Sequence, residues 1–196
     1  MENFEPDTYG DRIADLYDLW VDRADTPATV DTLVSLAGPG PVLELAVGTG
    51  RVAIPLAEAG LTVHGIDASE AMLDRLRSKP GGDTVAVTKG NMADVAVDQE
   101  FSLVFVVFNS FFCLLTQDDQ VRCFANSAAH LKPGGFFVLE GFVPDVTLYE
   151  RGQRVSVSRL ELGHVRLDVT RHWQNDQLVE TQHVVISDNG RRLVPV

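Results

Sequence analysis

The chain has 196 residues, 45% of them hydrophobic, with 28 acidic and 16 basic side chains and a formal net charge of −12. This length and composition allow a full hydrophobic core and argue against a disordered chain. A surface this acidic repels phosphate backbones and anionic headgroups, so neither nucleic acid nor a membrane is expected as a partner.

Several local features predict a cytoplasmic protein. Residues 1–12 are acidic and lack the basic-then-apolar plan of a signal peptide. The most apolar stretch, 101–115, is broken by polar residues and is too short to span a bilayer. Cys113 and Cys123 have no metal-ligand or redox spacing, so we expect buried, reduced thiols and no metal site.

Apolar runs alternate with helical patterns over the first two thirds of the chain. An amphipathic helix is predicted over 9–23, and Ser69 is predicted to cap a later helix. The predicted strands are 41–47, 61–67, 83–90, 100–108 and 134–142, and the helices between them are 50–60, 69–79 and 117–132. Strands that are apolar on both faces and separated by helices predict a parallel, doubly wound α/β sheet covered on both sides.

The pattern changes after Pro144. Apolar and polar residues alternate there in four segments, 154–162, 164–173, 177–187 and 191–196. The sequences QNDQ and DNGR are turn signals between the later segments. This period of two predicts an antiparallel β meander. The expected domains are therefore an α/β core over 1–143 and an appended meander over 144–196.

A glycine loop follows the first strand of the core. Residues 48–53 satisfy G-x-G-x-x-G/A, and Asp67 ends the next strand, where a carboxylate can take both ribose hydroxyls. This context predicts an adenosine-type ligand, but the pattern alone does not separate a dinucleotide from S-adenosylmethionine. Glu44 adds a carboxylate beside the loop, which suits an ammonium and a sulfonium better than two phosphates. Alternatively, Glu44 is a buried acid that caps a neighbouring helix.

Five motifs along 9–143 resemble those of the class I S-adenosylmethionine-dependent methyltransferases: VLELAVGTGR, HGIDASEAML, KGNMADV, FSLVFVVFNSFF and HLKPGGFFVLE. The meander and the segment YGDRIADLYD are similar to small-molecule methyltransferases of bacterial secondary metabolism, including enzymes that methylate amino sugars. The resemblance implies a Rossmann-like sheet in the order 3-2-1-4-5. It also implies S-adenosyl-L-methionine as cofactor and in-line methyl transfer to a nitrogen, oxygen or carbon of a small molecule.

The resemblance further implies a set of cofactor-binding residues, which comprises Tyr9, Tyr17, Glu44, Ala46, Gly48, Gly50, Asp67, Ala68, Met72, Asn91, Met92 and Phe108. The backbone around Ala46 and Gly48 would hold the methionine ammonium, and Asp67 the ribose. The adenine would pack on Ala68 and Met72, and Asn91 with the Met92 amide would read its edge. Phe108 would lie near the methyl group, and the two tyrosines would close the site or orient the substrate.

Simpler interpretations stay open for some of these residues. Met72 and Phe108 also fit plain core positions, and Tyr9 with Tyr17 also fit an amphipathic helix whose hydroxyls face water. No histidine stands out as a general base, so no catalytic residue is assigned. Two other functions stay open for the chain: an NAD-dependent oxidoreductase, and a methyltransferase-like protein that keeps the cofactor site but moves no methyl group.

Two departures from the family pattern matter. Asn91 replaces the usual aspartate, and its carbonyl oxygen can still accept the adenine amino proton. The closing strands, sixth and seventh in the family core, have no counterpart after the fifth, so we expect a truncated form or an edge that another chain covers. The alternating residues of the meander predict one apolar face, and we expect a homodimer through 150–196 that buries it. That face comprises Val155, Val157, Val165, Leu167, Val169, Val184 and Ile186.

Overall fold

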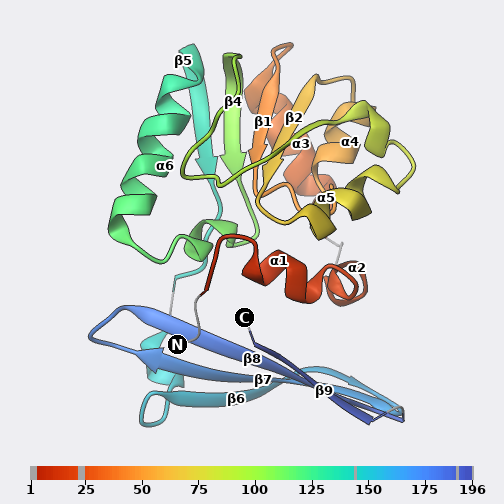
Figure 1. Cartoon of the computed structure of the whole chain (residues 1–196), viewed down its shortest axis with the longest axis vertical. Coiled ribbons are helices and arrows are strands. Elements are labelled where there is room, and N and C mark those ends of the chain that lie inside the picture. The colour runs from red at the N-terminus through yellow and green to blue at the C-terminus, as the bar shows by residue number, and fades with distance from the viewer. Residues whose placement is uncertain (1–3, 22–24, 144, 189, 196) are drawn as a thin grey trace. The chain divides into compact units, whose positions relative to one another are not determined.

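The computed structural model describes residues 4–21, 25–143, 145–188 and 190–195 (Figure 1). The chain divides into two compact units, 1–142 and 143–196, and each is described here by itself.

The first unit is built on a five-stranded parallel sheet. Its strands are β1 (Val42–Leu45), β2 (Val63–Asp67), β3 (Ala86–Lys89), β4 (Phe101–Val106) and β5 (Leu131–Leu139). Their order is β3-β2-β1-β4-β5, and every neighbouring pair is parallel. The predicted α/β class and strand order are therefore confirmed.

Four longer helices connect and cover these strands, and their bounds are α3 (Thr26–Ala37), α4 (Ala53–Glu58), α5 (Glu70–Arg77) and α6 (Gln117–Ala129). Short 3₁₀ turns, η1 (Gly82–Thr84) and η2 (Ser110–Cys113), lie in two of the connections. Ser69 caps α5 as predicted, because its side chain accepts the Met72 N–H.

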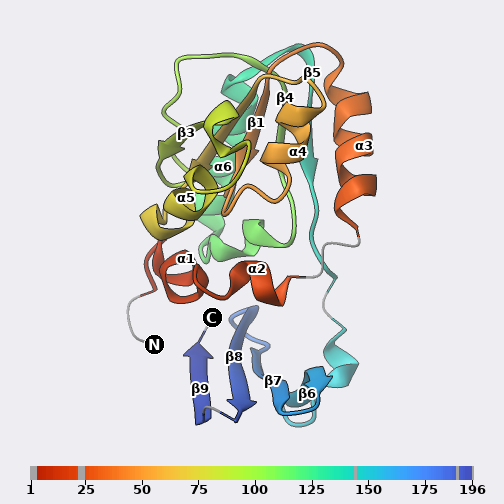
Figure 2. The same ribbon diagram turned by 90° about the vertical axis from the view of Figure 1, so that its right-hand side faces the viewer.

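Each face of the sheet has its own hydrophobic core, because successive side chains along a strand point to opposite faces. Val42 of β1 belongs to the cluster that also contains residues of α3, α4 and α5. Leu43, the next residue, belongs to the other cluster, which includes Cys123 of α6. Helices α3 and α6 accordingly lie on opposite faces of the sheet (Figure 2).

The N-terminal segment differs from its prediction. In place of one helix over 9–23, the structure has α1 (Thr8–Ile13) and α2 (Tyr17–Trp20), and residues 22–24 lie outside the described residues. Helices this short are marginal by themselves, so tertiary contacts decide where each one ends. Both lie across the carboxyl ends of the strands (Figure 1).

Helix α3 was not predicted. It carries Pro27 in its first turn and ends at Gly38, whose φ of 58° lies in the left-handed region. Proline near the start and glycine just past the end are ordinary helix boundary signals. The sequence therefore contained the evidence for this helix.

The second unit is an antiparallel sheet of β6 (Gln153–Glu161), β7 (His164–Trp173), β8 (Leu178–Ser187) and β9 (Gly190–Pro195), preceded by the 3₁₀ turn η3 (Val146–Leu148). The strands pair in sequence order, so the predicted meander is confirmed. Leu167 pairs with Val157 on one side and Val184 on the other, which places the predicted apolar residues on one face. On the opposite face, Asp168 accepts a hydrogen bond from His183 at 2.7 Å.

Strand β5 ends the parallel sheet, and among the described residues it pairs only with β4. Phe136 on this strand is 51% exposed. That another strand covers this edge stays a prediction. Within the described ranges, no helix is both long and apolar enough to cross a membrane.

Candidate functional site

The glycine loop between β1 and α4 depends on unusual backbone conformations. Ala46, Gly48 and Gly50 have φ values of 55°, 56° and 78°, all in the left-handed region. A Cβ on Gly50 would lie 2.8 Å from the Leu76 side chain of α5, so the loop and this helix approach closely only because glycine is there. Ala46 adopts the same region with a side chain, which costs about 1–2 kcal/mol. The loop is therefore held in shape by contacts from outside it.

Asp67 supplies two of those contacts. One carboxylate oxygen accepts the Gly48 N–H at 2.7 Å, and the other accepts the Ser69 N–H at 2.9 Å. Burial raises the pKa of Asp67, the two N–H donors lower it, and the nearby Asp11 raises it again. The side chain thus connects the glycine loop to the start of α5, and each oxygen keeps a second lone pair for a ligand hydroxyl.

Glu44 is a buried acid beneath the same loop. The residue is only 4% exposed, and burial, opposed by the charge of Arg51, raises its pKa to about 8. The Ala53 N–H, at the start of α4, lies near enough to oppose this rise in the pKa, which fits the helix-capping interpretation. The other oxygen, Oε2, has no hydrogen-bond partner among the described residues. The acid therefore lies beside the start of a helix and has one buried oxygen without a hydrogen-bond partner among the described residues.

Arg51 brings a positive charge to this group and was missed by the sequence analysis. Its guanidinium donates to Thr26 Oγ1 at 3.0 Å, lies 4.7 Å from the centre of the Phe108 ring and is near enough to lower the pKa of Tyr17. Burial raises the pKa of Tyr17 against the opposing effect of Arg51, so the phenol keeps its proton. Burial and a nearby guanidinium do not fit the interpretation in which the Tyr17 hydroxyl faces water. The signal for Arg51 was its place directly after Gly50.

Two acidic side chains fasten the N-terminal segment to the loop region. Asp11 of α1 accepts a hydrogen bond from the Ser69 hydroxyl at 2.6 Å. Asp18 of α2 accepts from the buried Thr49 hydroxyl at 2.9 Å and pairs with Lys79 at 2.7 Å. These contacts join residues 31 to 61 positions apart in the chain, and no local pattern indicates them.

Helix α1 also approaches α5 very closely. A Cβ on Gly10 would lie 2.4 Å from Ser69 Cβ and 3.1 Å from Met72 Cγ. Met72 is 3% exposed, and Tyr9, beside Gly10, is half-buried. The structure thus places Met72 and Ser69 against α1. Ala68, which directly follows the end of β2, is half-buried.

The end of β4 is strained. Phe108 and Asn109 have φ values of 59° and 65°, and neither is glycine. The Phe108 N–H donates to Glu140 Oε2 at 2.9 Å, and Asn109 Oδ1 accepts the Phe142 N–H at 2.7 Å. The Phe108 ring is 39% exposed and meets the Tyr17 ring edge-on at 6.4 Å between centroids. Phe108 is therefore not a plain core residue.

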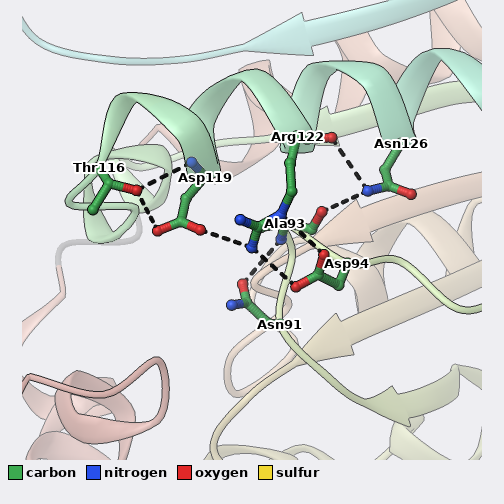
Figure 3. Close-up of polar contacts among 7 residues, drawn as sticks. All are labelled: Asn91, Ala93, Asp94, Thr116, Asp119, Arg122 and Asn126. Atoms are coloured by element: carbon green, nitrogen blue, oxygen red, sulfur yellow. Dashed lines mark hydrogen bonds and ion pairs between the residues drawn. The ribbon is translucent and has the colours of Figure 1, made fainter.

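Asn91 and Met92 lie in the loop after β3, which a polar network joins to α6 (Figure 3). Arg122 of α6 bonds Asp94 at 3.2 Å, and the Asn126 amide donates to Ala93 O at 2.6 Å. Asn91 Oδ1 accepts the Ala93 N–H at 2.9 Å, so one lone pair of that oxygen is already used. Met92 is 8% exposed, and its side chain packs in the core on the α6 side of the sheet.

The structure places Tyr17, Glu44, Arg51, Asp67 and Phe108 around the glycine loop, linked by the contacts above. No histidine belongs to this group: His64, for example, bonds Thr88 at 2.9 Å within the sheet. Among the described residues, no cluster of three or more potential metal ligands occurs. Both cysteines are free.

A glycine loop after β1, an acid at the end of β2 and the order β3-β2-β1-β4-β5 define a Rossmann-like protein. The family model for the methyltransferase domain matches residues 42–135. The solved structure of the CcbJ methyltransferase from Streptomyces caelestis is 39% identical, with a TM-score of 0.90 over 98% of this chain and 80% of that chain. The chain belongs to the class I S-adenosylmethionine-dependent methyltransferases.

Curated relatives match a smaller share of their own length. The cypemycin N-terminal methyltransferase of a Streptomyces species is 33% identical over 139 residues, which is 69% of this chain and 57% of the relative. The dTDP-3-amino-3,4,6-trideoxy-alpha-D-glucopyranose N,N-dimethyltransferase of Streptomyces venezuelae is 31% identical over 134 residues, which is 65% of this chain and 56% of the relative. The chain spans a little over half the length of these two curated relatives.

Proposed function

We propose that this chain binds S-adenosylmethionine at the glycine loop and transfers its methyl group to a small-molecule acceptor. The observation that carries the proposal is the pair of carboxyl groups at the loop, half-buried Asp67 and buried Glu44, with the charge of Arg51 near Glu44. Glu44, buried beneath the loop with an unpartnered oxygen, suits a cation better than the pyrophosphate of a dinucleotide, whereas an acid at the position of Asp67 fits the ribose of either cofactor. Together the two acids suit a ligand that has a ribose, an ammonium and a sulfonium.

The residues around the loop fit the separate parts of this cofactor. Asp67 would bind the ribose hydroxyls, and the unpartnered oxygen of Glu44, with the backbone at Ala46 and Gly48, would bind the ammonium. Arg51 would bind the carboxylate, since a guanidinium pairs well with one. The adenine would contact residues from three segments, namely Ala68, Met72, Asn91 and Met92.

S-adenosylmethionine supplies a methyl group already activated by a sulfonium, so the protein mainly has to align the acceptor. Phe108 and Tyr17, in edge-on ring contact, would shape the position of the acceptor. Tyr17 keeps its proton and would orient the acceptor as a hydrogen-bond donor. The relative from Streptomyces venezuelae is named as an N,N-dimethyltransferase, which makes amines the first acceptors to test.

Isothermal titration with S-adenosylmethionine, S-adenosylhomocysteine and NAD tests the cofactor. We expect both sulfur compounds to bind and NAD to bind more weakly or not at all, because NAD would bring its pyrophosphate against Glu44 and has no ammonium for the unpartnered oxygen of that residue. Tighter binding of NAD would contradict the proposal. Transfer of a labelled methyl group to a panel of amines, followed by mass spectrometry, then tests the reaction. Cofactor binding without transfer to any acceptor would favour a methyltransferase-like binding protein.

We also propose that the chain forms a homodimer through its second unit. The apolar face of the meander is exposed at its rim: Val155, Leu160 and Leu193 are 65%, 75% and 56% exposed. A two-fold pairing of identical sheets buries the same patch on both copies. We expect an interface above about 1,000 Å², and light scattering at low micromolar concentration should give twice the chain mass. A monomer mass would contradict the dimer.

The proposed partners are thus a small-molecule acceptor and a second copy, without nucleic acid or membrane, as the net charge of −12 suggests. A cytoplasmic location is proposed from the free thiols of Cys113 and Cys123.

A further inference from the structure

Glu44 combines features that an ordinary helix-capping acid does not need. Its carboxyl group is buried under the glycine loop, and Oε2 has no partner among the described residues. An unpaired polar atom in such a place is costly, because burial removes its water and gives nothing in return. A carboxyl group avoids most of that cost by holding a proton.

The charged groups that face Glu44 come from three further elements. Arg51, in the loop before α4, favours the ionised form, and Asp67, at the end of β2, opposes it. The Ala53 N–H also favours the ionised form, and Tyr17 of α2 lies close enough to be influenced by the Glu44 charge. The Arg51 guanidinium is shared with Thr26, Tyr17 and the Phe108 ring. Burial affects the pKa of Glu44 more than these neighbours do and raises it to about 8, so the acid keeps its proton at neutral pH.

We propose that Glu44 exchanges its proton for the ammonium of the cofactor, so that binding of S-adenosylmethionine or S-adenosylhomocysteine releases one proton to solvent. The inference rests on the proposed function, because it needs the cofactor at the glycine loop. An ammonium at Oε2 supplies the hydrogen bonds and the positive charge that this oxygen lacks, so the ionised form becomes favoured. Glu44 thereby determines how cofactor affinity depends on pH.

The consequence is a pH dependence that belongs to the protein and not to the ligand. Between pH 5.5 and 7.0 the ligand amine stays protonated and its carboxylate ionised, since their ordinary pKa values lie near 7.7–8.0 and 3.3–3.7. If one proton leaves on binding, affinity in this range rises about tenfold per pH unit. Glu44→Gln removes the proton that is exchanged and keeps a carbonyl oxygen for the Ala53 N–H.

The test is titration calorimetry of the full chain at pH 6.5 with S-adenosylhomocysteine and S-adenosylmethionine. Each titration is repeated in buffers of different ionisation enthalpy, because the slope of the observed enthalpy against that enthalpy counts the protons released. We expect a slope near one proton for the wild type with either ligand and near zero for Glu44→Gln. The control variant Glu58→Gln, which removes an exposed carboxylate of α4, should release as many protons as the wild type.

A second measurement, infrared spectroscopy, uses the wild type alone and so does not depend on whether the variants fold. The infrared band of a protonated carboxyl group should disappear when ligand is added. Ligand binding with no proton released, or release with S-adenosylmethionine alone, would overturn the exchange with the ammonium. Absence of any binding heat for both ligands, in protein shown to be folded by circular dichroism, would overturn the proposed function instead.

Discussion

Replacing Asp67 by alanine should weaken the binding of S-adenosylhomocysteine by about 100-fold or more. The change removes the proposed partner of the ribose hydroxyls and leaves the N–H groups of Gly48 and Ser69 without their acceptor. Each buried donor left unpaired costs about 1–3 kcal/mol, so the apo protein should also lose stability. Isothermal titration measures the first effect, and chemical denaturation of the ligand-free protein measures the second.

The matched control is Asp74→Ala on α5. Its side chain is 70% exposed and pairs with Arg77 on the surface, which contributes little to stability. We expect this variant to bind the ligand as the wild type does. An Asp67→Ala protein with unchanged affinity would remove Asp67 from the site. A protein that lost stability but kept its affinity would leave Asp67 with a role in the loop alone.

Replacing Glu44 by glutamine should make the ligand-free protein more stable than the wild type at pH 8, while the two should be similar near pH 4.5. Burial raises the pKa of Glu44 from its ordinary value of 4.5 to about 8. Between these values the folded state holds a proton that the unfolded state has lost. The wild type therefore loses stability as pH rises through this window. One pKa unit corresponds to about 1.4 kcal/mol, so we expect the variant to gain at least about 1 kcal/mol at pH 8.

Denaturant unfolding of the ligand-free proteins at several pH values checks this expectation. The free energies of wild type and Glu44→Gln should diverge as pH rises, whereas the control Glu58→Gln, which changes an exposed carboxylate of α4, should follow the wild-type profile. Parallel profiles for wild type and Glu44→Gln would show that the pKa of Glu44 is the same in the folded and unfolded states. A gain in stability at pH 8 would show that the buried acid is kept at the expense of the fold.

Much of the first unit could be predicted because its signals are local. Alternating apolar runs give the strands, Ser69 gives a helix cap, and the residues from Gly48 to Ala53 give the loop. The acid at the end of β2 is recognisable from its distance to that loop. Chain connectivity then restricts a parallel sheet with these crossovers to few arrangements, and the resemblance to a known family selected the one observed.

The features that the sequence analysis missed or predicted wrongly depend on contacts between residues that are distant in the chain. The split of the N-terminal helix follows from where Asp11 and Asp18 meet Ser69 and Thr49, and neither contact has a sequence pattern. Arg51 stood beside the glycine loop, but its importance appears only when Tyr17 and Phe108 are seen around it. The sequence suggested two alternative roles for Glu44, as a helix cap and as a ligand of the cofactor. That the residue is buried and that one of its oxygens has no partner could be learned only from the structure.

The position of Phe108 is mechanically connected to the boundary between the two units. Glu140 and Phe142, which hold the strained end of β4, lie within the last three residues of the first unit. Phe108 and Asn109 are each in a conformation that costs about 1–2 kcal/mol without support. The two hydrogen bonds therefore tie this strained turn to the backbone that follows β5, so the position of the Phe108 ring beside Arg51 depends on residues 140–142 as well as on β4.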